Sequence, residues 1–149
     1  MHSSAVDSSQ NSKGKRRVMV VENHRFFREN LISWIASQEH LECCCVAEDV
    51  SEAQRATESC QPDLILLDLT LNGLGGFDFL QWLGPRTAQF PVIVLSQYEE
   101  ERYAATALEA GARGYVTKAA ATEELLPAIA AVLAGDCYIS GGRGAFSRQ

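Results

Sequence analysis

Leu64-Ile65-Leu66-Leu67-Asp68 is an unbroken apolar run that ends in a carboxylate, and a turn-prone stretch with three glycines, residues 69–76, follows it at once. A short continuous apolar run is typical of a strand that is buried on both faces of a parallel sheet. Ligands of such sheets bind beyond the carboxyl ends of the strands. The sequence therefore places Asp68 where chemistry is expected.

Strand and helix patterns alternate along the whole chain on either side of this run. This alternation predicts an α/β fold, a doubly wound five-stranded parallel sheet with helices on both faces. Ser51 with Gln54 predicts a capping box for the second helix, and Thr122 is expected to cap the last, where Pro127 predicts a bend or a late start. The expected strands are 17–21, 41–47, 64–67, 91–95 and 114–116, and the expected helices are 24–37, 51–60, 77–83, 99–110 and 122–134.

The length and composition limit the chain to one ordinary domain. Its 149 residues suggest a disordered leader (1–16), one domain (17–135), and a flexible tail or the start of a linker (136–149). No stretch approaches the ~20 apolar residues that cross a bilayer, so no membrane association is expected. The net charge of −6 argues against direct nucleic-acid binding by this chain.

The five cysteines follow neither a zinc-binding spacing nor a paired disulfide framework, which favours a reducing, cytoplasmic location. Cys43, Cys44 and Cys45 are adjacent, and alternation along a strand predicts that they cannot all bind one metal ion. We expect them to be small buried hydrophobic residues, and a redox-sensing role is the less favoured alternative.

Polar side chains directly follow four of the predicted strands, and in a doubly wound sheet they gather at one edge. An acyl phosphate formed on Asp68 would use this set: a carboxylate nucleophile, oxygen ligands for Mg²⁺, a hydroxyl and an ammonium group. The backbone carbonyl of Thr70 is a further candidate ligand of Mg²⁺. The side chains at this edge are Glu22, Asn23, Asp68, Ser96 and Lys118.

Four motifs resemble those of response-regulator receiver domains over about residues 17–135. They are residues 20–24, 66–69, 94–96 and 114–118, while residues 23–29, 110–115 and 124–129 resemble the NarL/FixJ class. The resemblance implies a flavodoxin-like (CheY-like) fold with strand order 2-1-3-4-5. It also implies phosphorylation by a sensor histidine kinase or phosphotransfer protein, a phosphorylation-linked homodimer, and control of transcription through a LuxR-type DNA-binding domain outside this chain.

The resemblance also assigns roles to individual residues. Asp68 is the phospho-acceptor, Lys118 pairs with the phosphoryl group, Ser96 is the switch hydroxyl and Tyr115 the switch aromatic residue. Glu22 and Asn23 stand at the acidic pair, which binds Mg²⁺ together with Asp68.

Two departures from the family pattern qualify these roles. The acidic pair is usually two aspartates, so Glu22 with Asn23 predicts weaker Mg²⁺ binding. Asn72-Gly73 replaces the common Pro-Gly and predicts a less rigid turn. The main alternative is therefore an atypical receiver that acts as a phosphorylation-independent interaction module. A phosphatase with an aspartyl nucleophile is a third hypothesis, although Thr70 stands where its second catalytic aspartate is expected.

Overall fold

The structure, a computed structural model, describes residues 14–73 and 75–140. Of the predicted leader, residues 1–13 lie outside the described residues, and Arg16 already belongs to the first strand. Of the predicted tail, residues 141–149 lie outside them. Among the described residues, no helix has the length and apolar character needed to span a membrane.

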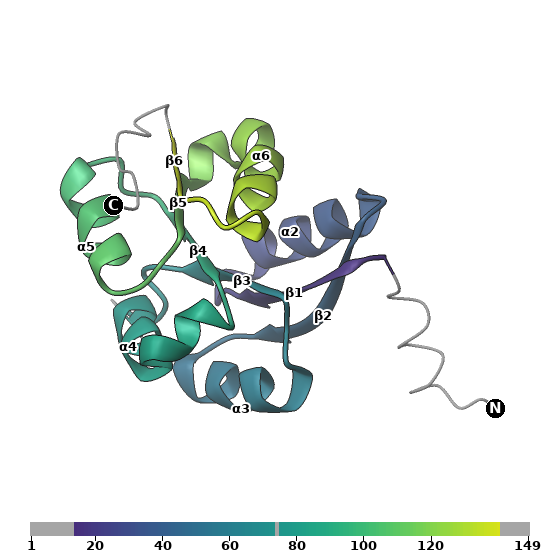
Figure 1. The fold of residues 1–149 in the computed structure, drawn as a ribbon, viewed down its shortest axis with the longest axis horizontal. Coiled ribbons are helices and arrows are strands. Elements are labelled where there is room, and N and C mark those ends of the chain that lie inside the picture. Colours follow the sequence, from purple (N-terminus) through teal and green to yellow (C-terminus); the bar gives the residue numbers. More distant parts are fainter. Residues whose placement is uncertain (1–13, 74, 141–149) are drawn as a thin grey trace.

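All the strands of the sheet are parallel, and they follow the order β2-β1-β3-β4-β5-β6 (Figure 1). The predicted fold and the order 2-1-3-4-5 are confirmed. The strands are β1 (Arg16–Val21), β2 (Leu41–Ala47), β3 (Leu64–Asp68), β4 (Val92–Ser96), β5 (Gly114–Thr117) and β6 (Tyr138–Ile139). The sequence did not predict β6, because two residues are too few to show a periodic pattern.

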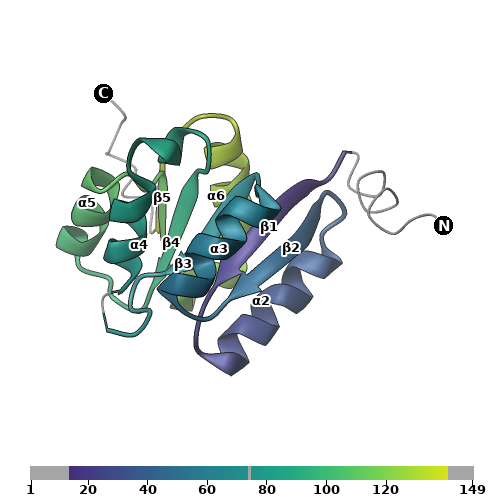
Figure 2. The ribbon, with the colours of Figure 1, turned by 90° about the horizontal axis from the view of Figure 1, so that it is seen from below.

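The helices cover both faces of the sheet. Apolar side chains of α2 (Arg25–Ser37) and α6 (Ala121–Leu133) pack on one face. The other face carries α3 (Val50–Cys60), α4 (Gly75–Leu83) and α5 (Glu101–Glu109), as the view from below shows (Figure 2). Short 3₁₀ helices η1 (Gly84–Ala88) and η2 (Lys118–Ala120) follow α4 and β5.

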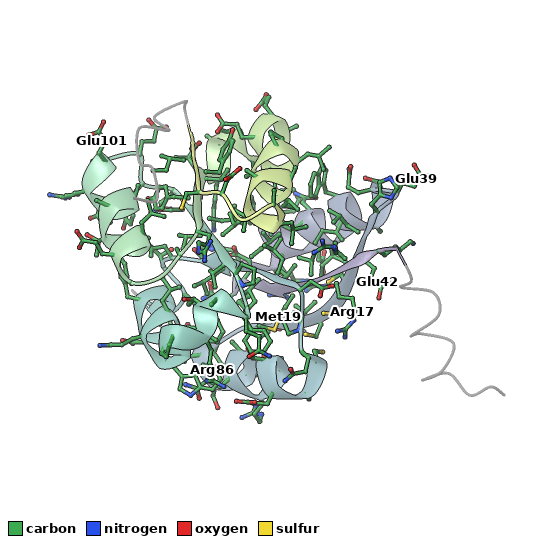
Figure 3. The ribbon with its side chains drawn as sticks, in the orientation of Figure 1. Arg17, Met19, Glu39, Glu42, Arg86 and Glu101 are labelled. Atoms are coloured by element: carbon green, nitrogen blue, oxygen red, sulfur yellow. The ribbon has the colours of Figure 1, made fainter. Side chains whose placement is uncertain are left out.

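The core has two halves, one on each face of the central strands. Every residue of β3 is buried, and its side chains alternate between the two apolar clusters, with Ile65 and Leu67 in one and Leu64 and Leu66 in the other. In Figure 3, Met19 of β1 lies within the molecule, whereas Glu39 and Glu101 lie at its periphery. The prediction that the run 64–67 is buried on both faces is confirmed.

Several predicted helix boundaries are wrong, because local hydrogen bonds favour other residues. The Asp49 side chain accepts from the Glu52 N–H at 2.8 Å, and the Glu52 carboxylate accepts from the Glu48 N–H at 2.8 Å. The capping box of α3 therefore begins at Asp49, whose carboxylate reaches the orphan amide, and not at Ser51.

The last helix also begins earlier than predicted. The turn η2 leads directly into α6 at Ala121, so Thr122 lies inside the helix and is not its cap. Pro127 is accommodated inside α6, so the helix does not start late. The helix α4 ends at Leu83, directly before Gly84-Pro85, as predicted, and the 3₁₀ helix η1 follows it.

Candidate functional site

The carboxyl ends of β1, β3, β4 and β5 bring the predicted side chains to one edge of the sheet. Glu22 follows β1, Asp68 ends β3, Ser96 ends β4 and Lys118 follows β5. Because these strands are parallel neighbours in register, residues distant in sequence become adjacent in space. Glu22, Asp68 and Ser96 are buried there.

Lys118 holds the two carboxylates together. Its Nζ lies 3.2 Å from Glu22 Oε1 and 3.5 Å from Asp68 Oδ1. It also lies 4.6 Å from the centre of the Phe27 ring, a cation–π contact that covers the amine with an apolar surface. The chain turns into η2 immediately at Lys118, which places the base of its side chain at the sheet edge.

The two oxygens of Asp68 have different surroundings. Oδ1 accepts hydrogen bonds from the backbone N–H and the hydroxyl of Thr70, both at 3.1 Å. Oδ2 is buried and has no hydrogen-bond partner in the described part of the chain. Since an unsatisfied buried oxygen costs free energy, Oδ2 is the atom that a cation or an electrophile would satisfy.

The surroundings of Glu22 destabilise the charged form of its carboxylate. Burial and then the charge of Asp68 raise its pKa to about 7, against the opposing effects of Lys118 and of the His24 N–H, which donates to Oε2 at 3.1 Å. The Oε1 atom lies near Lys118 Nζ without hydrogen-bonding geometry. At neutral pH this site therefore holds a proton on Glu22 for part of the time.

Glu22, Asp68 and His24 form a candidate cation site. One donor atom from each lies within 4.8 Å of the others. His24 was not among the predicted ligands, and its place three residues after the strand end was the only signal in the sequence. Two buried carboxylates with unsatisfied oxygens suit Mg²⁺, which binds through one or two carboxylates and keeps several waters. The residues present therefore fit the ion that the resemblance implies.

Asn23 and Thr70 have other contacts than the predicted ones. Asn23 is exposed, and its side-chain N–H₂ donates to Asn72 Oδ1 at 3.3 Å. Thr70 contacts Asp68 through its amide and hydroxyl. Of the predicted metal ligands, the structure brings Glu22 and Asp68 together directly, and roles for Asn23 and the Thr70 carbonyl stay predictions.

The turn at Asn72-Gly73 differs in kind from a Pro-Gly turn. Both residues have positive φ, 47° at Asn72 and 88° at Gly73. Proline is fixed near −65° and cannot occupy position 72 in this conformation, whereas asparagine tolerates it. The two departures from the family pattern, at positions 23 and 72, thus contact each other.

The predicted switch residues both bind the backbone of Tyr98, through the two peptide groups on either side of its Cα. Ser96 Oγ accepts from the Tyr98 N–H at 2.9 Å, and the Tyr115 hydroxyl donates to the Tyr98 carbonyl at 2.7 Å. Tyr115 is buried, and the Tyr98 ring stacks on Tyr103 with centroids 4.5 Å apart. A movement of Ser96 is thereby linked to Tyr115 through the backbone of Tyr98.

Comparison with known proteins gives a consistent result. The sequence model of the response regulator receiver domain matches residues 18–130. The response regulator GacA of Pseudomonas aeruginosa is 32% identical over 83% of this chain and 58% of its own length, and the transcriptional regulatory protein DegU of Brevibacillus brevis is 29% identical over 89% and 56%. This chain thus spans less than 60% of either relative.

Solved structures agree with these relatives. A two-component response regulator of the LuxR family from Aurantimonas sp. SI85-9A1 superposes with a TM-score of 0.80 and 32% identity, over 85% of this chain and 91% of that one. The isolated receiver domain of RcsB from Salmonella enterica gives a TM-score of 0.76 at 17% identity, which bears on the fold alone. The named relatives are regulators, which favours signalling over the phosphatase hypothesis.

Proposed function

This chain belongs to the response regulator receiver domain family, and we propose that it accepts a phosphoryl group on Asp68 from a sensor histidine kinase or a phosphotransfer protein. The observation that carries the proposal is the asymmetry of Asp68. Oδ1 is fixed by Thr70 and Lys118, while Oδ2 is left without a hydrogen-bond partner among the described residues. Oδ2 is therefore the nucleophilic oxygen.

The transfer is a single displacement at phosphorus. Oδ2 attacks the phosphorus of a phosphohistidine, the P–N bond breaks as the O–P bond forms, and the departing imidazole takes a proton. The product is an acyl phosphate on Asp68. Lys118, already 3.5 Å from Oδ1, offsets the charge that arrives with the phosphoryl group.

Glu22 and Asp68 would hold Mg²⁺, with His24, Asn23 and the Thr70 carbonyl as further candidates. When bound, the ion would supply positive charge to the phosphoryl oxygens. We expect the affinity to be weak because only two carboxylates contribute and because Glu22 binds a proton near neutral pH.

Phosphorylation would act on the output face through Ser96. A phosphoryl oxygen would accept a hydrogen bond from the Ser96 hydroxyl and draw it away from the Tyr98 N–H, which donates to Ser96 Oγ, and the carbonyl of Tyr98 is the group that binds Tyr115. The equilibrium between two arrangements of α5, β5 and α6 would shift, and that face would form a homodimer. By analogy with its relatives, a cytoplasmic regulator of transcription would use this domain, with DNA contacts made outside this chain.

A second function has its own supporting observation. Lys118 already pairs with both carboxylates, and Asn23 pairs with Asn72, so the site has internal partners in place of a metal ion. These contacts between side chains would be sufficient for an interaction module that works without phosphorylation.

One experiment separates the two functions. The protein is mixed with Mg²⁺ and acetyl phosphate, and the intact mass is measured. We expect the added mass of one phosphoryl group, absent from the Asp68→Asn variant and present in an Asp78→Asn control on the exposed part of α4. No added mass with acetyl phosphate or with a phosphorylated histidine protein would overturn the proposal and favour the interaction module.

A further inference from the structure

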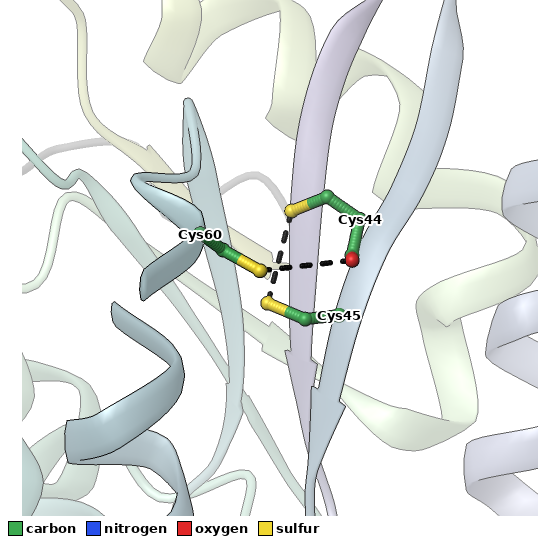
Figure 4. Close-up of side chains that lie close together, drawn as sticks. All are labelled: Cys44, Cys45 and Cys60. Carbon is green, nitrogen blue, oxygen red and sulfur yellow. Dashed lines mark hydrogen bonds between the residues drawn. The ribbon is translucent and has the colours of Figure 1, made fainter. Parts of the chain in front are cut away.

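Three thiols gather between β2 and the end of α3, away from the phosphorylation site. Cys44 and Cys45 lie on β2, and Cys60 is the last residue of α3 (Figure 4). The sulfur atoms of Cys44 and Cys45 are 3.8 Å apart, the Cys60 thiol donates to the Cys44 carbonyl at 3.7 Å, and all three sulfurs lie within 4.8 Å of one another. All three cysteines are free thiols.

An irregularity in β2 makes this arrangement possible. Val18 of β1 pairs with Cys43 and Met19 pairs with Cys45, so Cys44 is an extra residue on β2. Such a bulge breaks the alternation of side chains. Cys44 and Cys45 therefore pack against the same apolar cluster, and Cys43 packs against the cluster on the opposite face. Our expectation of strict alternation is wrong for Cys44 and Cys45, although it holds for Cys43.

The spacing of the sulfurs suits a shared metal ion. A metal bound at about 2.3 Å from each thiolate requires sulfurs about 3.8–4.0 Å apart, in tetrahedral or trigonal geometry. The Cys44–Cys45 distance already has this value, and the Cys60 sulfur needs a shift of less than about 1 Å. A disulfide needs sulfurs about 2.05 Å apart, which would demand a larger movement.

The surroundings favour a thiolate at Cys44. The guanidinium of Arg17 donates to the Cys60 carbonyl at 2.7 Å, so its charge lies beside the cluster. A hydrogen bond from Cys45 and the charge of Arg17 lower the pKa of Cys44 to about 7, although burial opposes them. The same hydrogen bond, with burial, raises the pKa of Cys45, and burial raises the pKa of Cys43 to about 11. All of these cysteines are half-buried residues.

We propose that Cys44, Cys45 and Cys60 form a three-thiolate site for a soft monovalent metal ion of the Cu(I) class. Thiolates select soft ions, and no fourth Cys, His, Asp or Glu joins the group within residues 14–73 and 75–140. Three ligands complete the coordination of Cu(I) but leave Zn²⁺ one protein ligand short of a closed tetrahedral site. Binding releases the thiol protons to solvent and connects the end of α3 to β2.

The test uses Cu(I) itself, under nitrogen with ascorbate, in competition with a coloured Cu(I) chelator. We expect one Cu(I) per chain, with three sulfur neighbours at about 2.2–2.3 Å by X-ray absorption. Cys60→Ser should weaken binding by more than about 100-fold, because it removes a direct ligand. Cys43→Ser is the matched control, and its affinity should stay within about threefold of the wild type.

Several results would overturn the proposal. Equal loss of affinity in the Cys43→Ser and Cys60→Ser variants would show nonspecific thiol binding. Formation of a disulfide in air without uptake of Cu(I) under nitrogen would show a redox pair instead. If Cys60→Ser does not fold by circular dichroism, the wild-type protein decides: fewer than three sulfur neighbours, or less than one Cu(I) per chain, refutes the site.

Discussion

Replacing Glu22 by glutamine should change how the stability of the metal-free protein depends on pH. The folded state raises the pKa of Glu22 from 4.5 to about 7, mainly through burial and then through the charge of Asp68. Between these values the folded state binds more protons than the unfolded state. The free energy of unfolding therefore falls as the pH rises from about 4.5 to about 7, and the loss is complete above that range.

The structure also gives the size of this effect. At roughly 1.4 kcal/mol per pH unit, the pKa difference of Glu22 corresponds to about 3 kcal/mol lost at alkaline pH. Glu22 is fully buried, so solvent screening does not reduce this value. Glutamine keeps the acceptor for the His24 N–H but carries no charge. We expect the Glu22→Gln variant without metal to be more stable than the wild type at pH 8, by about 1–3 kcal/mol.

The assay is urea unfolding at about pH 5 and about pH 8, with EDTA and again with saturating Mg²⁺. The difference between variant and wild type reports Glu22 together with its interactions with Asp68 and Lys118, because the remaining titrating groups are common to both. Mg²⁺ should stabilise the wild type and have much less effect on the variant, since a ligand that binds only the folded state adds to its stability. Glu29→Gln, an exposed carboxylate on α2, is the control. Equal pH dependence in the wild type and the Glu22→Gln variant would refute the reasoning.

Three other substitutions test other parts of the site. Asn23→Asp should raise the Mg²⁺ affinity about tenfold by adding a third carboxylate, which calorimetric titration measures; unchanged affinity would exclude position 23 from the metal site. Gly76→Ala should cost about 1–3 kcal/mol in thermal unfolding, because its Cβ would lie 2.6 Å from the backbone oxygen of Leu69, while Gly75→Ala meets only side chains at 3.3 Å or more and should change little. Tyr115→Phe should cost about 1 kcal/mol, and a double-mutant cycle with Ser96→Ala should show coupling of about 0.5 kcal/mol or more, since both side chains bind the backbone of Tyr98; additive effects would argue against that link.

The sequence predicted the fold well because its main signals are local. Consecutive residues contain the pattern of a buried strand such as 64–68 and of the amphipathic helix that follows it, and the resemblance to receiver domains then supplied the order of the strands. The helix caps were predicted less well. Asp49 and Ser51 are both good capping residues, and only the packed backbone decides which amide each side chain reaches.

The sequence predicted which residues form the candidate site, but it did not predict the contacts between their side chains. The ends of parallel strands must meet, so Glu22, Asp68, Ser96 and Lys118 follow from topology alone. The sequence could not show that Lys118 pairs with both carboxylates, because that depends on side-chain directions across residues far apart in the chain. The sequence could not show the contact of Asn23 with Asn72 either, because these residues are also far apart in the chain.

The strand order followed from the resemblance to receiver domains, and the sequence by itself determined the α/β sheet and the edge at which Asp68 stands. Periodicity and topology suffice for these, since they depend on neighbouring residues and on chain connectivity. Only the tertiary structure decided which oxygen of Asp68 is left unsatisfied and which cysteines share a face. One extra residue in β2 moves Cys44 to the side of Cys45 and Cys60, and such a bulge arises from the pairing of two strands, which no stretch of sequence contains alone.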